Sequence, residues 1–322
     1  MKKIVIQGLG YVGLAMMTFC AGAKKNKKYL YNVTGVEKNS VKGFKIVKEI
    51  NSNQIPKIVD DKNFSNFYKK LIKEKRIKAT SDNHEYSKAD IIFICSNCDF
   101  DFTKDKVKLT DYIKNIEQVA KKIKNNCLLI IQSTLPPGTT KKILEPLIRK
   151  NLNKRKIKNF YLCHSFERIT PGRDYYSSMK NVERIIGGNN KKSLSMTKKV
   201  FRDIFQLNPH KIIEFNSPTE SETCKILENS YRAINIAFID EWTKFSNLMN
   251  VDLFNVIRSI KLRSTHSNIM NPGLGVGGYC LTKDPLFADI SGKILFPLPF
   301  NIEIEASINS IKLWGSILVD KP

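Results

Sequence analysis

The sequence predicts an α/β protein with a doubly wound parallel sheet, followed by a long connecting helix and a small all-α domain. Three observations predict it. Short apolar strands alternate with helical segments up to about residue 214, which is the pattern of parallel strands joined by helices. A glycine-rich turn follows the first strand. Beyond Phe215 the alternation ends in one long helical run. We therefore expect two domains, residues 1–214 and 215–322.

A glycine motif opens the first domain. Residues 2–7 form a predicted strand, and Gly8-Leu9-Gly10-Tyr11-Val12-Gly13 leads into an apolar helix over about 12–23. A GxGxxG between strand and helix is typical of a Rossmann-like dinucleotide-binding domain. The three glycines, in order, would allow the tight turn, the approach of backbone to a pyrophosphate and close helix packing. Tyr11 and Val12 would lie at the helix N-terminus, which faces the phosphates.

The end of the second strand predicts which dinucleotide binds. The strand at 32–36 is followed by Glu37, at the distance from the glycines where the fingerprint has an acidic residue. A carboxylate there would accept hydrogen bonds from both ribose hydroxyls and repel a 2′-phosphate. The sequence therefore favours NAD over NADP, although Lys38 slightly weakens the preference.

The rest of the first domain continues the alternation. The strand at 90–95 is apolar, as a buried parallel sheet requires. The turn Ser133 to Thr140 follows another strand at its carboxyl end, where ligands bind in such sheets; alternatively, Thr139 does no more than cap the next helix. Further strands are predicted at 77–82, 128–132, 160–163 and 184–188, and helices at about 110–124 and 190–206.

The second domain begins with a predicted helix over about 218–249. Ser217-Pro218-Thr219-Glu220 is a capping box with proline at the first helical position. Lys225 and Asn229 are spaced i,i+4 and share a face, with Glu222 and Arg232 close to it. Spacing alone favours a solvated face for this pair. Because so much of the helix is apolar, we expect it to join domains or subunits.

The stretch from 271 to 285 combines glycines with reactive side chains. Four glycines lie between 273 and 278, followed by Cys280, Lys283 and Asp284. A thiolate is the nucleophile in cysteine chemistry, and a nearby cation such as Lys283 would favour it. A glycine turn beside an ordinary buried cysteine is the alternative. These residues alone leave both interpretations open.

Composition excludes some classes of protein. The net charge is +24, but the lysines are spread along the whole chain, so we expect no specific nucleic-acid binding. No apolar run has the length of a membrane span, and the N-terminus does not read as a signal peptide. Seven scattered cysteines fit a reducing cytoplasm. Cys95 and Cys98 have no matching pair, so no metal site is expected.

Several separate blocks together resemble the UDP-glucose/GDP-mannose dehydrogenase family, which oxidises the C6 alcohol of a nucleotide-sugar to a carboxylate. The resemblance runs from the glycine motif to about residue 315. Its blocks are Gly8 to Leu14, Ser133 to Thr140, Glu167-Arg168-Ile169-Thr170-Pro171-Gly172, Arg184-Ile185-Ile186-Gly187-Gly188, Glu222 to Phe238, and Gly275 to Asp284.

The resemblance implies a role for each matching residue. Cys280 would be the nucleophile, with Lys225 stabilising the oxyanion beside Asn229. Glu167 would serve general acid/base catalysis, and Asp284 would position or activate water. The remaining matches lie around the cofactor or substrate: Thr134 near the nicotinamide and the reactive carbon, Ser96 at the cofactor, Lys283 beside the nucleophile, and Arg168 and Gly277 at the sugar nucleotide. Arg263 would meet the nucleotide phosphates or be a surface arginine.

The resemblance further implies two NAD molecules per turnover, a UDP-sugar substrate and a homodimer. The glycine-rich blocks look more like the N-acetylhexosaminuronate-forming branch. The sequence departs from the family at Ile94-Cys95-Ser96, usually Thr-Pro-Thr, and at Asp240-Glu241, usually Asn-Glu. The chain stops at Pro322, where the family's third, UDP-binding domain is expected to begin, either because the product is truncated or because that lobe is lost.

Two other functions stay open from the sequence. A non-catalytic NAD-binding remnant would bind cofactor without turnover, although the retained Cys280, Lys225, Glu167 and Asp284 argue against it. A single-step β-hydroxyacid dehydrogenase shares the glycine motif and a Lys/Asn pair on a helix, but it needs no cysteine.

Overall fold

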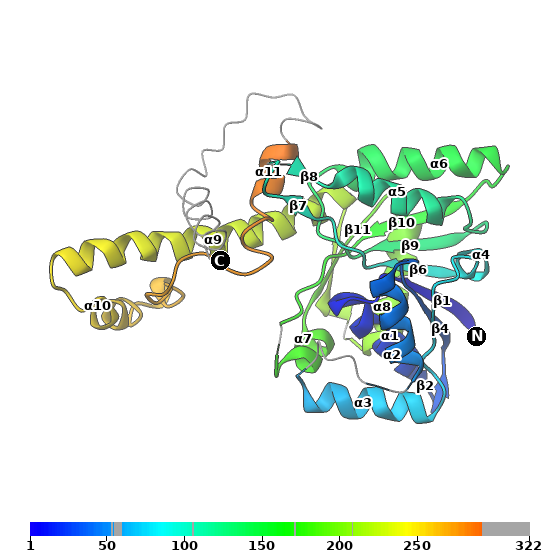
Figure 1. Cartoon of the computed structure of the whole chain (residues 1–322), viewed down its shortest axis with the longest axis horizontal. Helices are drawn as coiled ribbons and strands as arrows, with labels where there is room; N and C mark the ends of the chain where they lie inside the picture. The colour runs from blue at the N-terminus through cyan, green and yellow to red at the C-terminus, as the bar shows by residue number, and fades with distance from the viewer. Residues whose placement is uncertain (53, 55–59, 105, 171, 208, 292–322) are drawn as a thin grey trace. The chain divides into compact units, whose positions relative to one another are not determined.

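The computed structural model (Figure 1) describes residues 1–291, except 53, 55–59, 105, 171 and 208. The chain divides into two compact units, Met1–Glu222 and Thr223–Pro322. Each unit is described in turn.

The first unit is built on an eight-stranded sheet with the order β12-β11-β10-β9-β6-β1-β4-β5. Neighbouring strands are parallel, except that β10 and β11 run antiparallel. The strands are β1 (Lys2–Gln7), β4 (Tyr31–Val36), β5 (Ala79–Thr80), β6 (Ile91–Ile94), β9 (Cys127–Ile131), β10 (Phe160–His164), β11 (Arg184–Gly188) and β12 (Ile212–Phe215). The chain moves outward from β1 to β4 and β5 and then returns to β6, so the predicted doubly wound topology is confirmed.

Helices cover the sheet (Figure 1). Helix α1 contacts both α3 and α8, and α5 contacts α6. The helices of this unit are α1 (Tyr11–Gly22), α2 (Val41–Asn51), α3 (Lys62–Lys73), α4 (Glu85–Lys88), α5 (Leu109–Ala120), α6 (Glu145–Lys154), α7 (Tyr175–Asn181) and α8 (Lys191–Phe205), with a 3₁₀ turn η2 (Pro209–Lys211). Two short hairpins complete it: β2 (Lys24–Lys25) with β3 (Lys28–Tyr29), and β7 (Phe100–Asp101) with β8 (Lys106–Val107).

The core explains why the central strands are apolar throughout. Every residue of β6 and β9 is buried, because helices lie on both faces of a parallel sheet. Helix α1 is buried on almost all sides, which accounts for its uninterrupted apolar sequence. One detail differs from the prediction: the segment after the Ser133–Thr140 turn begins as a π-helix, η1 (Thr140–Leu144), before continuing as α6.

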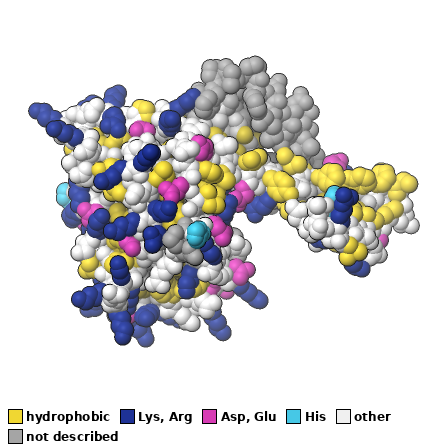
Figure 2. Space-filling model, turned by 180° about the vertical axis from the view of Figure 1, so that it is seen from behind, with side chains coloured by type: hydrophobic (Ala, Val, Ile, Leu, Met, Phe, Trp, Pro, Cys, Tyr) yellow, Lys and Arg dark blue, Asp and Glu magenta, His cyan; other side chains and the backbone are white. Residues whose placement is uncertain are grey.

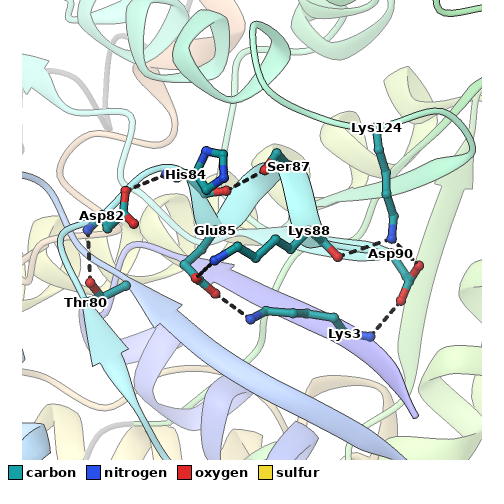
Figure 3. A network of polar contacts seen from close by, with 9 residues as sticks. All are labelled: Lys3, Thr80, Asp82, His84, Glu85, Ser87, Lys88, Asp90 and Lys124. Carbon is teal, nitrogen blue, oxygen red and sulfur yellow. Dashed lines mark hydrogen bonds and ion pairs between the residues drawn. The ribbon is translucent and has the colours of Figure 1, made fainter.

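A polar network holds α4 against the start of the sheet (Figure 3). The Glu85 carboxylate pairs with Lys3 at 2.5 Å and Lys88 at 2.7 Å. Asp90 pairs with Lys124 at 2.7 Å and accepts the backbone N–H of Lys3 at the same distance. Burial raises the pKa of Glu85, but its bonds to the two lysines outweigh this and leave the pKa lowered. These contacts join β1, α4 and the chain after α5 away from the carboxyl ends of the strands.

The second unit contains only helices among its described residues. They are α9 (Pro218–Leu248), whose first turn lies in the first unit, α10 (Leu253–Ile260), η3 (Ser264–His266) and α11 (Leu286–Ile290). One half of the predicted capping box forms at the start of α9, since Ser217 accepts the N–H of Glu220 at 3.3 Å. The Glu220 carboxylate accepts the N–H of Asn216 at 3.1 Å, one residue before the expected Ser217. Within the part of the chain that is described, no helix is long and apolar enough to cross a membrane.

Candidate active site

The glycine motif forms a close turn between β1 and α1. Gly8 has φ +84°, and a Cβ there would lie 2.9 Å from the backbone nitrogen of Ser96. A Cβ on Gly13 would lie 1.7 Å from the Gly8 carbonyl oxygen, whereas one on Gly10 would meet nothing within 4 Å. Gly8 and Gly13 are therefore required by packing, and Gly10 leaves open space for a ligand to approach the backbone at the N-terminus of α1.

Polar groups around this turn fit a dinucleotide. The Glu37 carboxylate accepts the N–H of Leu9 at 2.6 Å and that of Lys38 at 2.8 Å, so it supports the glycine turn as well as ending β4. The hydroxyl oxygen of Ser96 is buried without a hydrogen-bond partner. A buried hydroxyl without a partner beside a glycine turn is suited to a bound polar ligand. The residues present therefore fit NAD.

We expect Glu37→Gln to weaken NAD binding about tenfold, because a hydrogen bond to a charged group contributes about 1.5–3 kcal/mol. It should weaken NADP binding less, since repulsion of a 2′-phosphate is lost at the same time. Calorimetric titration with both cofactors measures the ratio. Glu74→Gln, an exposed carboxylate on the C-cap of α3, is the matched control. An unchanged ratio of the two affinities would contradict the role of Glu37.

Tyr11 connects the glycine turn to the segment after Glu167. Its backbone carbonyl accepts from the hydroxyl of Tyr175, and its own hydroxyl donates to the Thr170 carbonyl at 3.3 Å. The two tyrosine rings meet edge to face at 4.4 Å. Val12 is half-buried in the same turn.

Glu167 lies just beyond β10 as one half of a buried ion pair. Its Oε2 pairs with the Arg184 guanidinium at 2.5 Å, and its Oε1 accepts from the Gln132 amide at 2.5 Å. Arg184 is 1% exposed, also donates to the Met179 carbonyl, and lies 4.0 Å over the Phe205 ring. The guanidinium of the neighbouring Arg168 lies 5.3 Å from the Phe166 ring. The carboxylate of Glu167 is thus held in one orientation.

The segment Ser133–Thr140, which we term the Thr134 loop, follows β9. His164 at the end of β10 is fully buried, and burial lowers its pKa to about 4. Its Nε2 lies 3.1 Å from the Ser133 carbonyl oxygen and its Nδ1 lies 2.9 Å from the Ser221 hydroxyl. Since a carbonyl can only accept, the neutral ring carries its proton on Nε2 and Ser221 donates to Nδ1. Thr134 is half-buried, and the Thr139 hydroxyl donates to the Pro136 carbonyl at 2.6 Å.

In the second unit, α9 and the segment after the glycine-rich loop bring four predicted residues together. The Asn229 amide donates to Asp284 Oδ2 at 2.6 Å, and Lys283 Nζ pairs with Asp284 Oδ1 at 2.6 Å. Burial lowers the pKa of Lys225, while the charges of Asp284, Glu228 and Cys280 partly offset this. A buried ammonium within electrostatic range of a carboxylate and a thiol is the pattern of a functional site.

The solvated face that spacing favoured for Lys225 and Asn229 is wrong. Lys225 is 9% exposed and Asn229 is fully buried, because the chain from 276 to 287 packs on this side of α9. Cys280 is exposed, which excludes the buried-cysteine interpretation. Its carbonyl accepts the N–H of Asp284 at 2.9 Å, so the thiol sits on the same turn as the two charged residues.

The polar contacts of this cluster described above include neither Gly277 nor Arg263, two of the predicted substrate residues. Gly277 is half-buried, and a Cβ there would meet nothing within 4 Å. Arg263 is exposed where η3 begins. Across the ranges the structure describes, no group of three or more His, Cys, Asp or Glu side chains is placed to hold a metal ion.

Sequence reasoning missed the partners that hold these residues. The resemblance includes Arg184 only as part of a motif, but a charged residue at the start of an apolar strand is itself a signal for a buried ion pair. His164 and Ser221 carried no such signal, because 57 residues separate them in the chain. Gln132 reads as the ordinary polar end of a strand.

The fold and the glycine turn define a Rossmann-like dinucleotide-binding protein, and comparison with known proteins specifies its family. Residues 2–205 match the NAD binding domain of the UDP-glucose/GDP-mannose dehydrogenase family, and residues 219–291 match its central domain. The chain belongs to this family, and its first unit contains the family's NAD-binding domain.

Individual relatives agree with this assignment. The chain is 34% identical over 291 residues to a UDP-N-acetyl-D-mannosamine dehydrogenase of Methanococcus maripaludis, covering 89% of this chain and 61% of that one. It is 30% identical over 285 residues to the Pyrococcus horikoshii enzyme of that name, covering 88% and 63%. The solved UDP-D-ManNAc dehydrogenase structure from P. horikoshii superposes with a TM-score of 0.80 at 27% identity, over 98% of this chain and 70% of that one. The chain thus spans about three fifths of the length of these curated relatives.

Proposed function

We propose that the protein oxidises the C6 alcohol of a UDP-sugar to the carboxylate in two NAD-dependent steps. The observation that carries this proposal is the buried cluster in the second unit. It places the Lys225 ammonium, the Asn229 amide and the Asp284 carboxylate together, with the exposed Cys280 thiol on the adjoining turn. A single oxidation of an alcohol to a carbonyl has no use for such a thiol.

The thiol serves the second oxidation. After the first oxidation gives an aldehyde, the Cys280 thiolate attacks its carbon, forming a C–S bond and a thiohemiacetal once the oxygen takes a proton. Loss of hydride and of the hydroxyl proton then gives a thioester. Water attacks the thioester carbon, the C–S bond breaks, and the acid leaves as the thiol is restored. NAD, when bound, accepts the hydride in each oxidation.

The neighbouring side chains act on the oxygen of the reacting carbon. Lys225 and Asn229 would donate hydrogen bonds to the oxyanion, and a preorganised, partly desolvated cation is effective there. Burial lowers the Lys225 pKa, so the ammonium can also give up its proton more readily than an exposed lysine. Asp284, held by Asn229 and Lys283, would orient the water.

Glu167 would act as a base through a water or directly on the substrate. Its ion pair with Arg184 and its hydrogen bond from Gln132 hold the carboxylate in one orientation. In the first unit, Thr134 and Ser96 would contact the nicotinamide end of NAD. Lys283 is 4% exposed and paired with Asp284, so we propose that it orders Asp284 in addition to lying beside the nucleophile.

The relatives support one substrate class. The curated relatives quoted above are UDP-N-acetyl-D-mannosamine dehydrogenases, which supports a UDP-N-acetylhexosamine. The test is NADH formation by the purified chain with UDP-N-acetylmannosamine, UDP-N-acetylglucosamine, UDP-N-acetylgalactosamine, UDP-glucose and GDP-mannose. Turnover should yield about two NADH per sugar consumed. One NADH per sugar would favour a single-step dehydrogenase, and NAD binding without turnover of any of the five would favour a non-catalytic NAD-binding protein.

We further propose a homodimer formed through α9. Leu227, Tyr231, Ile234, Phe238, Trp242 and Phe245, which we term the α9 stripe, recur every three or four residues and are each more than two fifths exposed. Trp242 makes edge-to-face contacts with Phe238 and Phe245. Figure 2 shows hydrophobic side chains gathered on the surface of this part of the chain. Large exposed apolar patches mark interfaces.

We expect Trp242→Glu to convert a dimer to a monomer, because a central aromatic anchor supplies a large share of interface free energy. Sedimentation equilibrium measures the change, with Glu241→Gln, an exposed polar position on the same helix, as the control. A wild-type chain that sediments as a monomer would contradict the dimer.

A further inference from the structure

Two side chains in the first turn of α9 hold the Thr134 loop at both ends. Ser221 donates to His164, which donates to the Ser133 carbonyl. The Glu222 carboxylate accepts the N–H of Gly138 at 2.6 Å and that of Thr140 at 2.8 Å. Glu222 is fully buried. Both contacts lie within the first unit.

The bonds to Glu222 replace an ordinary helix cap. The residue before η1, Thr139, makes no side-chain cap of the helix, and its hydroxyl is bonded to Pro136 instead. The N–H groups at a helix start need acceptors, and a carboxylate is well placed at the positive end of the helix dipole. Here the acceptor comes from 82 residues further along the chain. The cap therefore depends on α9 being in place.

We propose that Glu222 is a positioning residue, which fixes the Thr134 loop to the start of the helix that carries Lys225 one turn later. This inference rests on the proposed function for its relevance to catalysis, since Thr134 is a proposed nicotinamide contact. The structural part of the inference stands on the two hydrogen bonds alone.

Protonation should weaken this attachment. Burial raises the pKa of Glu222 to about 7, opposed by its hydrogen bonds from Thr140 and Gly138. The titratable group facing it from α5 is Tyr112, whose pKa burial raises far above neutrality. The charged group next to Thr140 on η1 is Lys141, whose side chain is exposed to solvent. Below pH 7 one carboxyl oxygen carries a proton and loses acceptor strength toward an N–H, so the loop should open more often as the pH falls.

The linkage to global stability has the opposite sign. A raised folded-state pKa means that the folded chain binds more protons than the unfolded chain between about pH 4.5 and 7. The contribution of Glu222 to the free energy of unfolding therefore falls as pH rises through this window. Loop opening differs from global unfolding because Glu222 stays buried when the loop leaves it. The hydrogen bonds from Gly138 and Thr140 lower the pKa of Glu222, so losing them strengthens proton binding in the open state, and opening is favoured as the pH falls.

Hydrogen–deuterium exchange of the full chain, without sugar or cofactor, tests the proposal. After correction for intrinsic exchange rates, protection of residues 133–140 should be about tenfold lower near pH 6 than near pH 8. Protection of α8 should not change. Glu222→Gln should show low protection at both pH values, while Glu220→Gln, an exposed carboxylate in the same turn, should match the wild type.

Each outcome tests the positioning role of Glu222 independently of the enzymatic assay. A wild-type loop whose protection does not change between these pH values overturns the proposal, even if Glu222→Gln fails to fold. Equal pH dependence in Glu222→Gln overturns it as well. Turnover of a UDP-sugar is not needed for any of these readings, so failure of the proposed reaction leaves the result intact.

Discussion

Replacing Cys280 with alanine should abolish net oxidation of the sugar to the acid while leaving the cofactor site intact. Steady-state NADH formation should fall on the order of 10³-fold or more, because removing a covalent nucleophile eliminates the route through the thioester. Cys280 is exposed on its turn, so the substitution opens no cavity and the free energy of unfolding should change little. NAD affinity, measured by calorimetry, should be unchanged, since the glycine turn lies in the first unit.

Cys224→Ala is the matched control for this experiment. Cys224 is half-buried on α9 beside Lys225. The Cys224→Ala protein should retain turnover. A Cys280→Ala protein that still produces two NADH per sugar would remove the thioester from the mechanism. A Cys280→Ala protein that produces a single NADH per sugar at the wild-type rate, with the wild type also producing only one, would identify a single-step dehydrogenase.

The fold could be predicted because each of its signals is local. The glycine turn lies between a strand and a helix that are adjacent in the chain, and the contact that requires Gly13 is with the nearby Gly8 carbonyl oxygen. Strand β6 is apolar because both faces of a central strand are buried, so its own composition predicts a central position in the sheet. The same holds for the capping box that begins α9.

The site could be predicted only in part, because its geometry depends on contacts between distant residues. Spacing on α9 placed Lys225 and Asn229 on one face but gave the wrong environment, since the partner Asp284 lies 55 residues from Asn229. Likewise, Glu167 was identified from its motif, while its partner Arg184 on β11 depends on the antiparallel pairing of β10 and β11. No periodicity within one element reveals such pairs.

Replacing Lys225 with methionine should lower kcat about 10²–10³-fold, as removal of one preorganised donor to an oxyanion does. Methionine keeps most of the length of the side chain, which matters because Lys225 is 9% exposed. Asp284 would retain its bonds to Lys283 and Asn229, so the cluster should stay folded. KM for the sugar should change much less than kcat, because the oxyanion develops only during the reaction.

A second measurement on the same variant requires no substrate. Lys225 lies within electrostatic range of Cys280, and cysteines react faster beside a cation. If the ammonium acts on the sulfur, alkylation of Cys280 by iodoacetamide at neutral pH should be several-fold slower in Lys225→Met. Mass spectrometry of the Cys280 peptide reports the rate. Lys244→Met on the exposed part of α9, which removes a lysine paired with Glu241, should react like the wild type. Equal alkylation rates in all three proteins, with kcat preserved in Lys225→Met, would show that the buried ammonium acts on neither the thiol nor the reacting oxygen. The catalytic role of the cluster would then rest on Asn229 and Asp284 alone.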